Sequence, residues 1–218
     1  MTDLFSKFLY YFNLNFGISS LLYSLPGIIL AFTIHEYSHG LAAYMMGDKT
    51  AKQYGRLTLN PIAHIDPLGF LCLIVTRRFG WAKPVPVNDL NFKDRKKGML
   101  IVALAGPMSN FITALLIAVF YRLFYSSFGE VMIGIFQFAY IINLSIGVFN
   151  LIPIPPLDGS KILDVFLSNK QKFFMRRYAI YSNLIIIMLI FSGIIGAILG
   201  PVIRVLDWFI NSAVGLFF

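Results

Sequence analysis

The fold is decided by residues 18–48, which read ISSLLYSLPGIILAFTIHEYSHGLAAYMMGD. No Asp, Glu, Lys or Arg lies between Lys7 and Glu36, and this run is longer than the roughly 20 apolar residues that a membrane-spanning helix needs. Three ionisable side chains then follow within five residues, and Gly47-Asp48 is typical of a helix end. We therefore expect a helix over about 18–46 that enters a membrane and carries polar groups near its end.

Three further runs without a charged residue cover 98–121, 131–157 and 178–203. Of the 218 residues, 58% are hydrophobic and 13% are charged. A soluble domain of this size cannot hide so much apolar surface. We expect an all-α polytopic membrane protein with about four to six transmembrane helices. The later core helices are predicted over about 98–121, 131–152 and 178–199, with a short amphipathic helix over 158–167.

Residues 47–97 differ from the rest of the chain. Two short segments with β-branched residues, 55–59 and 70–75, are separated by Asn60-Pro61 and Asp66-Pro67. Prolines and β-branched residues argue against one long helix. The sequence therefore predicts a small membrane-associated β element between the first and second core helices. The single cysteine, Cys72, cannot form an internal disulfide.

Basic residues gather between the apolar runs. Ten of the 18 Lys and Arg lie in 47–97 and five more in 161–177. Membrane orientation explains the net charge of +8 better than a nucleic-acid partner does. Both basic segments are predicted to face the cytoplasm, in a prokaryotic plasma membrane, with Arg77 and Arg78 anchored to anionic headgroups. We expect a single membrane-embedded domain over 1–218, with its core over about 18–168 and C-terminal helices over about 178–218.

The ionisable group in the first helix is His35-Glu36-Tyr37-Ser38-His39, an H-E-x-x-H pattern. Two His at i and i+4 lie on one helical face and are spaced to bind one Zn²⁺. A Glu beside the first His is placed to act as a general acid and base. Because such groups are costly inside a membrane without a partner, the pattern favours a metal site over simple packing.

A catalytic zinc site needs a third protein ligand. The second Glu of the chain, Glu130, is predicted on the opposite side of the membrane. Asp158 is the better candidate, because the prolines at 153, 155 and 156 break the third helix just before it, in the leaflet that holds His39. Asp158 could also cap the helix that follows, and the two roles are compatible.

These motifs together resemble the site-2 protease family of intramembrane zinc metalloproteases. The resemblance rests on H-E-x-x-H and on Asn150-x-x-Pro153-x-Pro155-x-Leu157-Asp158-Gly159. It extends to residues 55–61, 64–69 and 80–88, which are similar to the compact branch without PDZ or CBS domains. It implies one zinc ion per chain, held by His35, His39 and Asp158, with Glu36 as the catalytic acid and base and Asn150 holding the substrate or the oxyanion.

The resemblance also implies an activity. The expected reaction is hydrolysis of peptide bonds in the transmembrane segments of membrane proteins, as in regulated intramembrane proteolysis. The partners are then transmembrane substrates and the lipid bilayer, with no nucleic acid. Residues 55–59 could pair as an edge strand with an unwound substrate.

Three alternatives stay open at this stage: a membrane metal or proton transporter, a catalytically inactive relative, and another membrane zinc protease that uses Glu130 as a ligand. Two residues are also undecided. Asn110, in an apolar helix, either packs against other helices or supports the catalytic residues. His64 lies either near the active site or in a remote loop.

Overall fold

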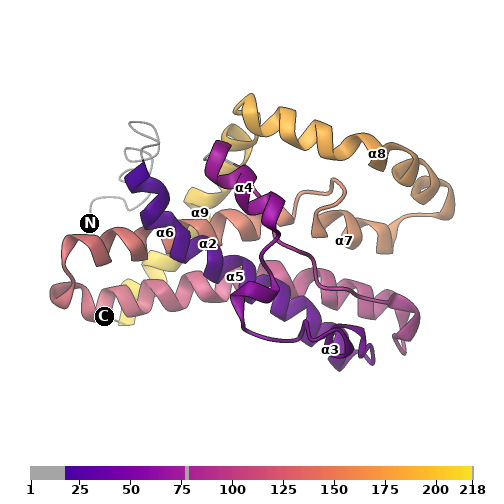
Figure 1. The fold of residues 1–218 in the computed structure, drawn as a ribbon, viewed down its shortest axis with the longest axis horizontal. Coiled ribbons are helices and arrows are strands. Elements are labelled where there is room, and N and C mark those ends of the chain that lie inside the picture. The colour runs from indigo at the N-terminus through magenta and orange to yellow at the C-terminus, as the bar shows by residue number, and fades with distance from the viewer. Residues whose placement is uncertain (1–17, 77–78, 218) are drawn as a thin grey trace.

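The computed structural model describes residues 18–76 and 79–217, and the chain is mostly helical over them (Figure 1). The expected headgroup anchors Arg77 and Arg78 lie outside these residues. The α-helices are α2 (Ile18–Met45), α3 (Thr50–Gln53), α4 (Pro67–Thr76), α5 (Arg95–Phe124), α6 (Glu130–Asn150), α7 (Asp158–Phe166), α8 (Asn169–Phe191) and α9 (Ile194–Phe217). Three short 3-10 turns are η1 (Pro61–Ala63), η2 (Asp89–Asn91) and η3 (Tyr125–Ser127).

Three long helices, α2, α5 and α6, pack against one another and form the centre of the molecule. Helices α5 and α6 follow each other through η3, and α2 crosses them at an angle (Figure 1). Small residues allow a close approach: a Cβ on Gly27 of α2 would lie 2.6 Å from the Cα of Ala139 in α6. Helix α7 packs on α5, α9 packs on α6 and α5, and α8 packs on α9.

Within the described residues, three helices are long and apolar enough to cross a membrane: Arg95–Ser127, Glu130–Asn150 and Ile194–Leu216. The bent pair Asn169–Met175 and Arg177–Phe191 adds a fourth if it is one span. Helix α2 is not among them. The described residues thus support a membrane protein of three spans, or four with the bent pair, whereas the sequence predicted about four to six.

The predicted β element was wrong. In the described part of the chain, residues 55–59 form no strand, and the β-structure of this region is the single bridge between Ile65 and Ala82. Residues 70–75 belong to helix α4. Asp66 accepts a hydrogen bond from the Gly69 N–H at 2.8 Å, and Pro67 stands at the first helical position, so the chain here has the start signals of a helix. A short apolar run does not distinguish a strand from a buried helix, and these signals decide it.

Two helices begin earlier than expected, because each has an N-terminal cap. Asp94 accepts from the Lys97 N–H at 3.0 Å, so α5 begins at Arg95 rather than at residue 98. Ser168 and Gln171 form a capping box, so α8 begins at Asn169 rather than at residue 178.

The C-terminal residues form a long helix, α9, within the region where helices were predicted. Its Asp207 carboxylate is buried and accepts hydrogen bonds from Tyr140 of α6 at 2.8 Å and from Asn211 at 2.7 Å. A buried carboxylate with hydrogen-bond donors is tolerated in an apolar helix. This cluster therefore ties α9 to the core.

Candidate metal centre and active site

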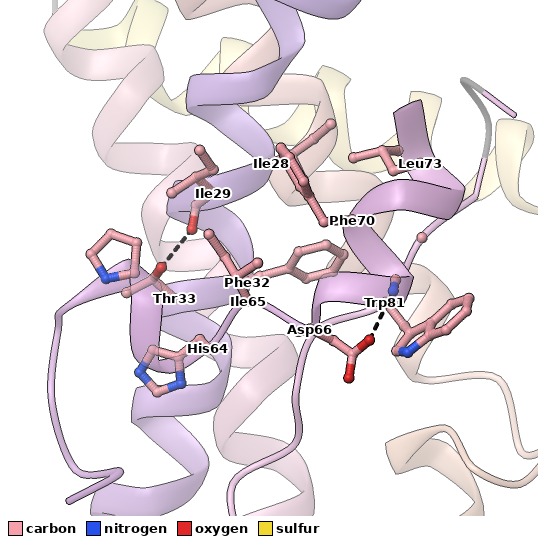
Figure 2. A pocket seen from close by; sticks show the side chains of 14 residues that line it. Ile28, Ile29, Phe32, Thr33, His64, Ile65, Asp66, Phe70, Leu73 and Trp81 are labelled. Atoms are coloured by element: carbon pink, nitrogen blue, oxygen red, sulfur yellow. Dashed lines mark hydrogen bonds between the residues drawn. The ribbon is translucent and has the colours of Figure 1, made fainter. Parts of the chain in front are cut away.

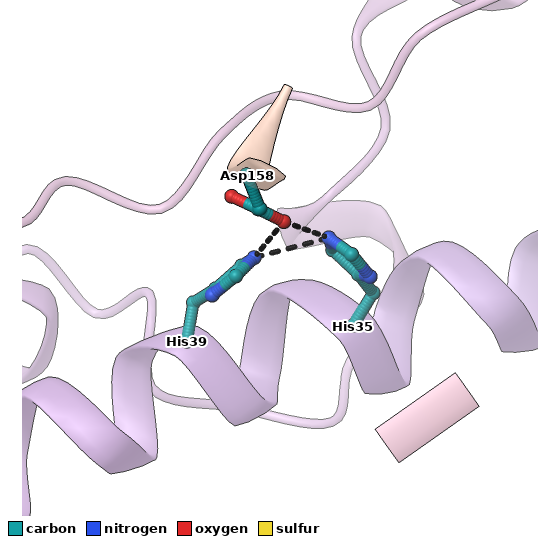
Figure 3. Close-up of side chains that lie close together, drawn as sticks. All are labelled: His35, His39 and Asp158. Carbon is teal, nitrogen blue, oxygen red and sulfur yellow. Dashed lines mark hydrogen bonds and ion pairs between the residues drawn. The ribbon is translucent and has the colours of Figure 1, made fainter. Parts of the chain in front are cut away.

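Three side chains meet where α2 passes the first turn of α7 (Figure 3). The Oδ2 atom of Asp158 lies 3.1 Å from His35 Nε2 and 3.0 Å from His39 Nε2, and the two Nε2 atoms are 3.0 Å apart. All three residues are buried. Two imidazole nitrogens and one carboxylate oxygen turned toward one point are a donor set that suits zinc.

Both imidazole rings are held in the form that a metal needs. The Nδ1 atom of His39 lies 2.7 Å from the Val102 carbonyl oxygen, and that of His35 lies 2.6 Å from the Asn110 side-chain oxygen. Each oxygen can only accept, so Nδ1 carries the proton in both rings and each Nε2 keeps its lone pair. Hydrogen bonds to the second nitrogen are the usual support of a metal-binding His.

Asn110 is itself held by a buried network. Its amide nitrogen donates to the Ala31 carbonyl and to the Asn143 side-chain oxygen, both at 3.1 Å. Asn143 in turn donates to the Ala139 carbonyl at 2.8 Å. The sequence left open whether Asn110 packs against other helices or supports the catalytic residues, and these contacts do both.

The carboxylate of Asp158 is shared between two neighbours. Oδ2 faces the His pair, and Oδ1 accepts from Lys161 Nζ at 2.9 Å, one turn further along α7. Burial would raise the pKa of the Asp158 carboxyl, but its contacts with His35 and His39 and the charge of Lys161 hold this pKa well below its usual range. Lys161 engages Oδ1, and Oδ2 is left for the centre.

Glycine at position 106 makes room for the two rings. A Cβ there would overlap His39 Nε2 and would lie 2.6 Å from His35 Cε1. Gly106 is followed by Pro107, yet α5 continues through both to Phe124. The glycine therefore serves close approach and does not break the helix.

Glu36 lies beside the cluster but outside the group of three. Its Oε2 accepts a hydrogen bond from the backbone N–H of Val85 at 2.7 Å. Pro84 and Pro86 have no N–H, so Val85 supplies the single backbone donor of the 84–86 segment. The sequence does not mark Val85, because its contact with Glu36 joins distant segments. The contact of Lys161 with Asp158 is local, at i and i+3 on α7, and this spacing could have indicated it.

Two other predicted residues are not part of this cluster. Asn150 ends α6, and its side chain donates to the Ile146 carbonyl at 3.0 Å rather than to the cluster. Glu130 begins the same helix of 21 residues, about 30 Å from its other end. The alternative that needs Glu130 as a third ligand does not fit this placement.

An H-E-x-x-H helix whose His pair meets a carboxylate from a distant element defines the zinc metalloprotease class. The sequence model of peptidase family M50 matches residues 127–193. The "Putative zinc metalloprotease YwhC" of Bacillus subtilis is 37% identical over 206 residues, which cover 91% of each chain. The chain therefore belongs to peptidase family M50, the site-2 protease family.

Other relatives agree with this assignment. The "Putative zinc metalloprotease Rip2" of Mycolicibacterium smegmatis is 27% identical over 175 residues, which cover 77% of this chain and 66% of that protein. The "Zinc metalloprotease MJ0392" of Methanocaldococcus jannaschii is 33% identical over 117 residues, which cover 50% of this chain and 33% of that protein. No solved structure matches the chain significantly.

Family and fold together make this chain an integral membrane zinc metalloprotease that acts on proteins in the membrane. The expected enzyme class and cofactor are confirmed. A metal or proton transporter is not supported, because the relatives are named as metalloproteases.

Proposed function

We propose that the protein hydrolyses peptide bonds inside the transmembrane segments of other membrane proteins, as in regulated intramembrane proteolysis. The observation that carries this proposal is the buried convergence of His35, His39 and Asp158 beside Glu36. Helix α5, which packs on α2 and on α7 at this centre, is apolar enough to cross a bilayer. A substrate would therefore meet the centre in the membrane, where its own spanning segment lies.

In this proposal His35, His39 and Asp158 hold the zinc ion, which when bound supplies Lewis-acid chemistry and makes a water molecule more acidic. Glu36 takes the proton of the attacking water and passes it to the leaving amine nitrogen. The Val85 N–H holds one oxygen of Glu36, so the other oxygen is the one that moves the proton. Asn150 is assigned to the substrate or the oxyanion, and its amide must first leave the Ile146 carbonyl.

The substrate helix must unwind before it is cut. Its carbonyl groups are engaged in helical hydrogen bonds, and a carbonyl in such a bond cannot reach the centre in the geometry of attack. Residues that weaken a helix near the cut site, such as Gly or Asn, are therefore expected to raise the rate of cleavage.

We also propose that the whole chain is one membrane-embedded domain with its active site toward the cytoplasm of a prokaryotic cell. Asp158 and Lys161 lie at the start of the basic segment 161–177, and the other basic segment, 47–97, follows the H-E-x-x-H helix. The positive-inside tendency places both segments on the cytoplasmic side.

The test is a cleavage assay in liposomes with single-span substrates and zinc content measured on every variant. Glu36→Gln should keep its zinc and lose cleavage by several orders of magnitude, and a chelator should stop the wild type. Glu130→Gln, which changes the other Glu of the chain, should cut as the wild type does. Unimpaired cleavage by Glu36→Gln, or a wild type that carries no zinc, would overturn the proposal.

A further inference from the structure

A small pocket opens between α2, η1, α4 and residues 80–82 (Figure 2). Its wall is mostly apolar and includes Phe32 of α2, Phe70 of α4 and Trp81. Its volume is about 20 Å³, enough for one water molecule or the end of a small side chain. No residue assigned to the metal centre lines this pocket.

His64, which lines the pocket, has one nitrogen without a partner. The residue is 1% exposed, and its Nε2 lies 2.7 Å from the Thr58 carbonyl oxygen. The carbonyl can only accept, so Nε2 carries the proton and Nδ1 is an acceptor. In the described structure no side chain or backbone group donates to Nδ1. An unmet buried acceptor is costly, so the site favours a ligand that brings a donor.

The neighbours of His64 in the pocket do not supply this donor. The hydroxyl of Thr33 donates to the Ile29 carbonyl at 2.6 Å. The carboxylate of Asp66 is an acceptor and already takes the Gly69 N–H. Neither neighbour therefore donates to His64 Nδ1, and the group that matches this acceptor must be a donor.

The pocket lies next to the proposed catalytic carboxylate. Phe32 and Thr33 line it, and Glu36 follows them at i+4 and i+3 on the same face of α2, about one helical turn or 5 Å further along. The second wall, residues 80–82, continues directly to Val85, which donates to Glu36. A peptide bound at Glu36 would thus lie about one helical turn from the residues that line the pocket.

We infer that this pocket is a side-chain subsite for a serine or threonine of the unwound substrate, with the hydroxyl donating to His64 Nδ1. The inference rests on the proposed function and names a sequence preference of the same site. The small volume excludes long side chains, including Lys and Arg, although these carry donors. Ala fits the space but leaves Nδ1 unmet, and a hydroxyl both fits and donates.

The test uses single-span substrates that carry one Ser or one Ala at each position around the cut site in turn. At one position the Ser substrate should be cut faster than the Ala substrate, by about three- to tenfold, the worth of one net hydrogen bond. In His64→Gln this ratio should fall to about one. The Gln amide can still donate to the Thr58 carbonyl but has no acceptor at the place of Nδ1, and unchanged zinc content checks the fold. The control Gln137→Leu removes a hydrogen bond to Tyr121 and no pocket residue, so it should keep the ratio.

A second measurement separates this inference from the proposed function. The same peptides are cross-linked to Glu36→Gln, which binds without cutting. If the peptides bind with a Ser preference that needs His64 but the wild type does not cut them, the subsite stands and the proposed function fails. Cleavage without a Ser preference at any position, or a preference that survives in His64→Gln, overturns the subsite alone. Peptides that are neither bound nor cut overturn both.

Discussion

Asn110 has no exposed surface, and it is the residue that couples the metal centre to the packing of the helices. Its oxygen accepts from the His35 ring, and its amide nitrogen reaches α2 at Ala31 and α6 at Asn143. One side chain thus joins the three central helices at the level of the cluster. A group with this position serves both stability and the orientation of a ligand.

Replacing Asn110 with Leu should weaken zinc binding by roughly 10- to 100-fold, because the His35 ring loses the acceptor that fixes its tautomer. Competition with a chelator of known affinity measures this loss. Asn143→Leu should weaken binding less, since it removes a neighbour of Asn110 and leaves the bond to His35 in place. Equal zinc affinity in Asn110→Leu and the wild type would contradict the role given to this residue.

Gly106→Ala should separate stability from metal binding. Alanine favours a helix over glycine by about 1 kcal/mol, so the metal-free protein need not lose stability through its backbone. The new methyl group, however, would occupy the place of His39 Nε2, and zinc per chain should fall well below that of the wild type.

The matched control for this prediction is Gly134→Ala in α6. There the nearest atom to a new Cβ, on Tyr23, is 3.6 Å away, an ordinary van der Waals contact. This variant should keep its zinc. Full zinc occupancy in Gly106→Ala would show that the rings can move aside.

At the scale of elements, residues 84–86 contact Glu36 of α2 through one backbone donor, the Val85 N–H, which lies between two prolines. Val85→Pro removes this N–H, and the new proline is the same residue type as both of its neighbours. We expect kcat to fall at least tenfold with zinc content unchanged, because Glu36 loses the bond that positions it. Val85→Ala keeps the N–H and should stay close to the wild type. A Val85→Pro variant with normal kcat would mean that the bond does not position Glu36.

Asp48 joins the end of α2 to two later segments. Its fully buried carboxylate accepts from the backbone and hydroxyl of Thr50, from the Asn88 backbone and from the Asn91 amide. Burial would raise the pKa of Asp48, but the bonds from Thr50, Asn91 and Asn88 hold it below its ordinary value. The carboxylate thus fixes the connection between the first and second central helices.

The pH dependence of stability follows from this lowered pKa. The bonds of Asp48 contribute fully above the pKa of the unfolded chain, about 4, and are lost as the pH falls through the lower folded pKa. Asp48→Asn should lower the free energy of unfolding by about 1–3 kcal/mol near neutral pH. The amide NH₂ of Asn would replace a carboxylate oxygen that accepts hydrogen bonds, and it would then face N–H and O–H groups that also donate. Unfolding midpoints measured from neutral pH to below pH 4 should converge for wild type and variant, and a constant gap would contradict the assignment.

The elements differ in how well the sequence predicted them. His35 and His39 are readable because their spacing is local to one helix, and Asp158 follows from the order of the apolar runs. The strand prediction for 70–75 failed because a short apolar run fits both a strand and a helix. The helix start at Asp66-Pro67 decides between the two. The roles of Asn110 and Val85 depend on contacts between distant segments, which hydropathy and spacing do not encode.

At the scale of the whole molecule, the proposed orientation can be tested with the one native cysteine removed. In a Cys72→Ala background, Lys93→Cys lies in the basic segment before α5, and Ser126→Cys lies in the turn between α5 and α6. A membrane-impermeant thiol reagent applied to intact cells should label position 126 and not position 93. Labelling of both positions after lysis is the control. The opposite pattern would place the active site outside the cytoplasm.

The metal centre also sets a time at which the protein can first become active. Asp158 comes 119 residues after His39, so the ribosome adds the last ligand roughly 6 to 24 s after the His pair, at about 5–20 residues per second. Until then the nascent chain holds a His pair without its carboxylate. If the proposed ligand set is right, we expect the complete zinc site, and with it the activity, to form only when synthesis is far advanced.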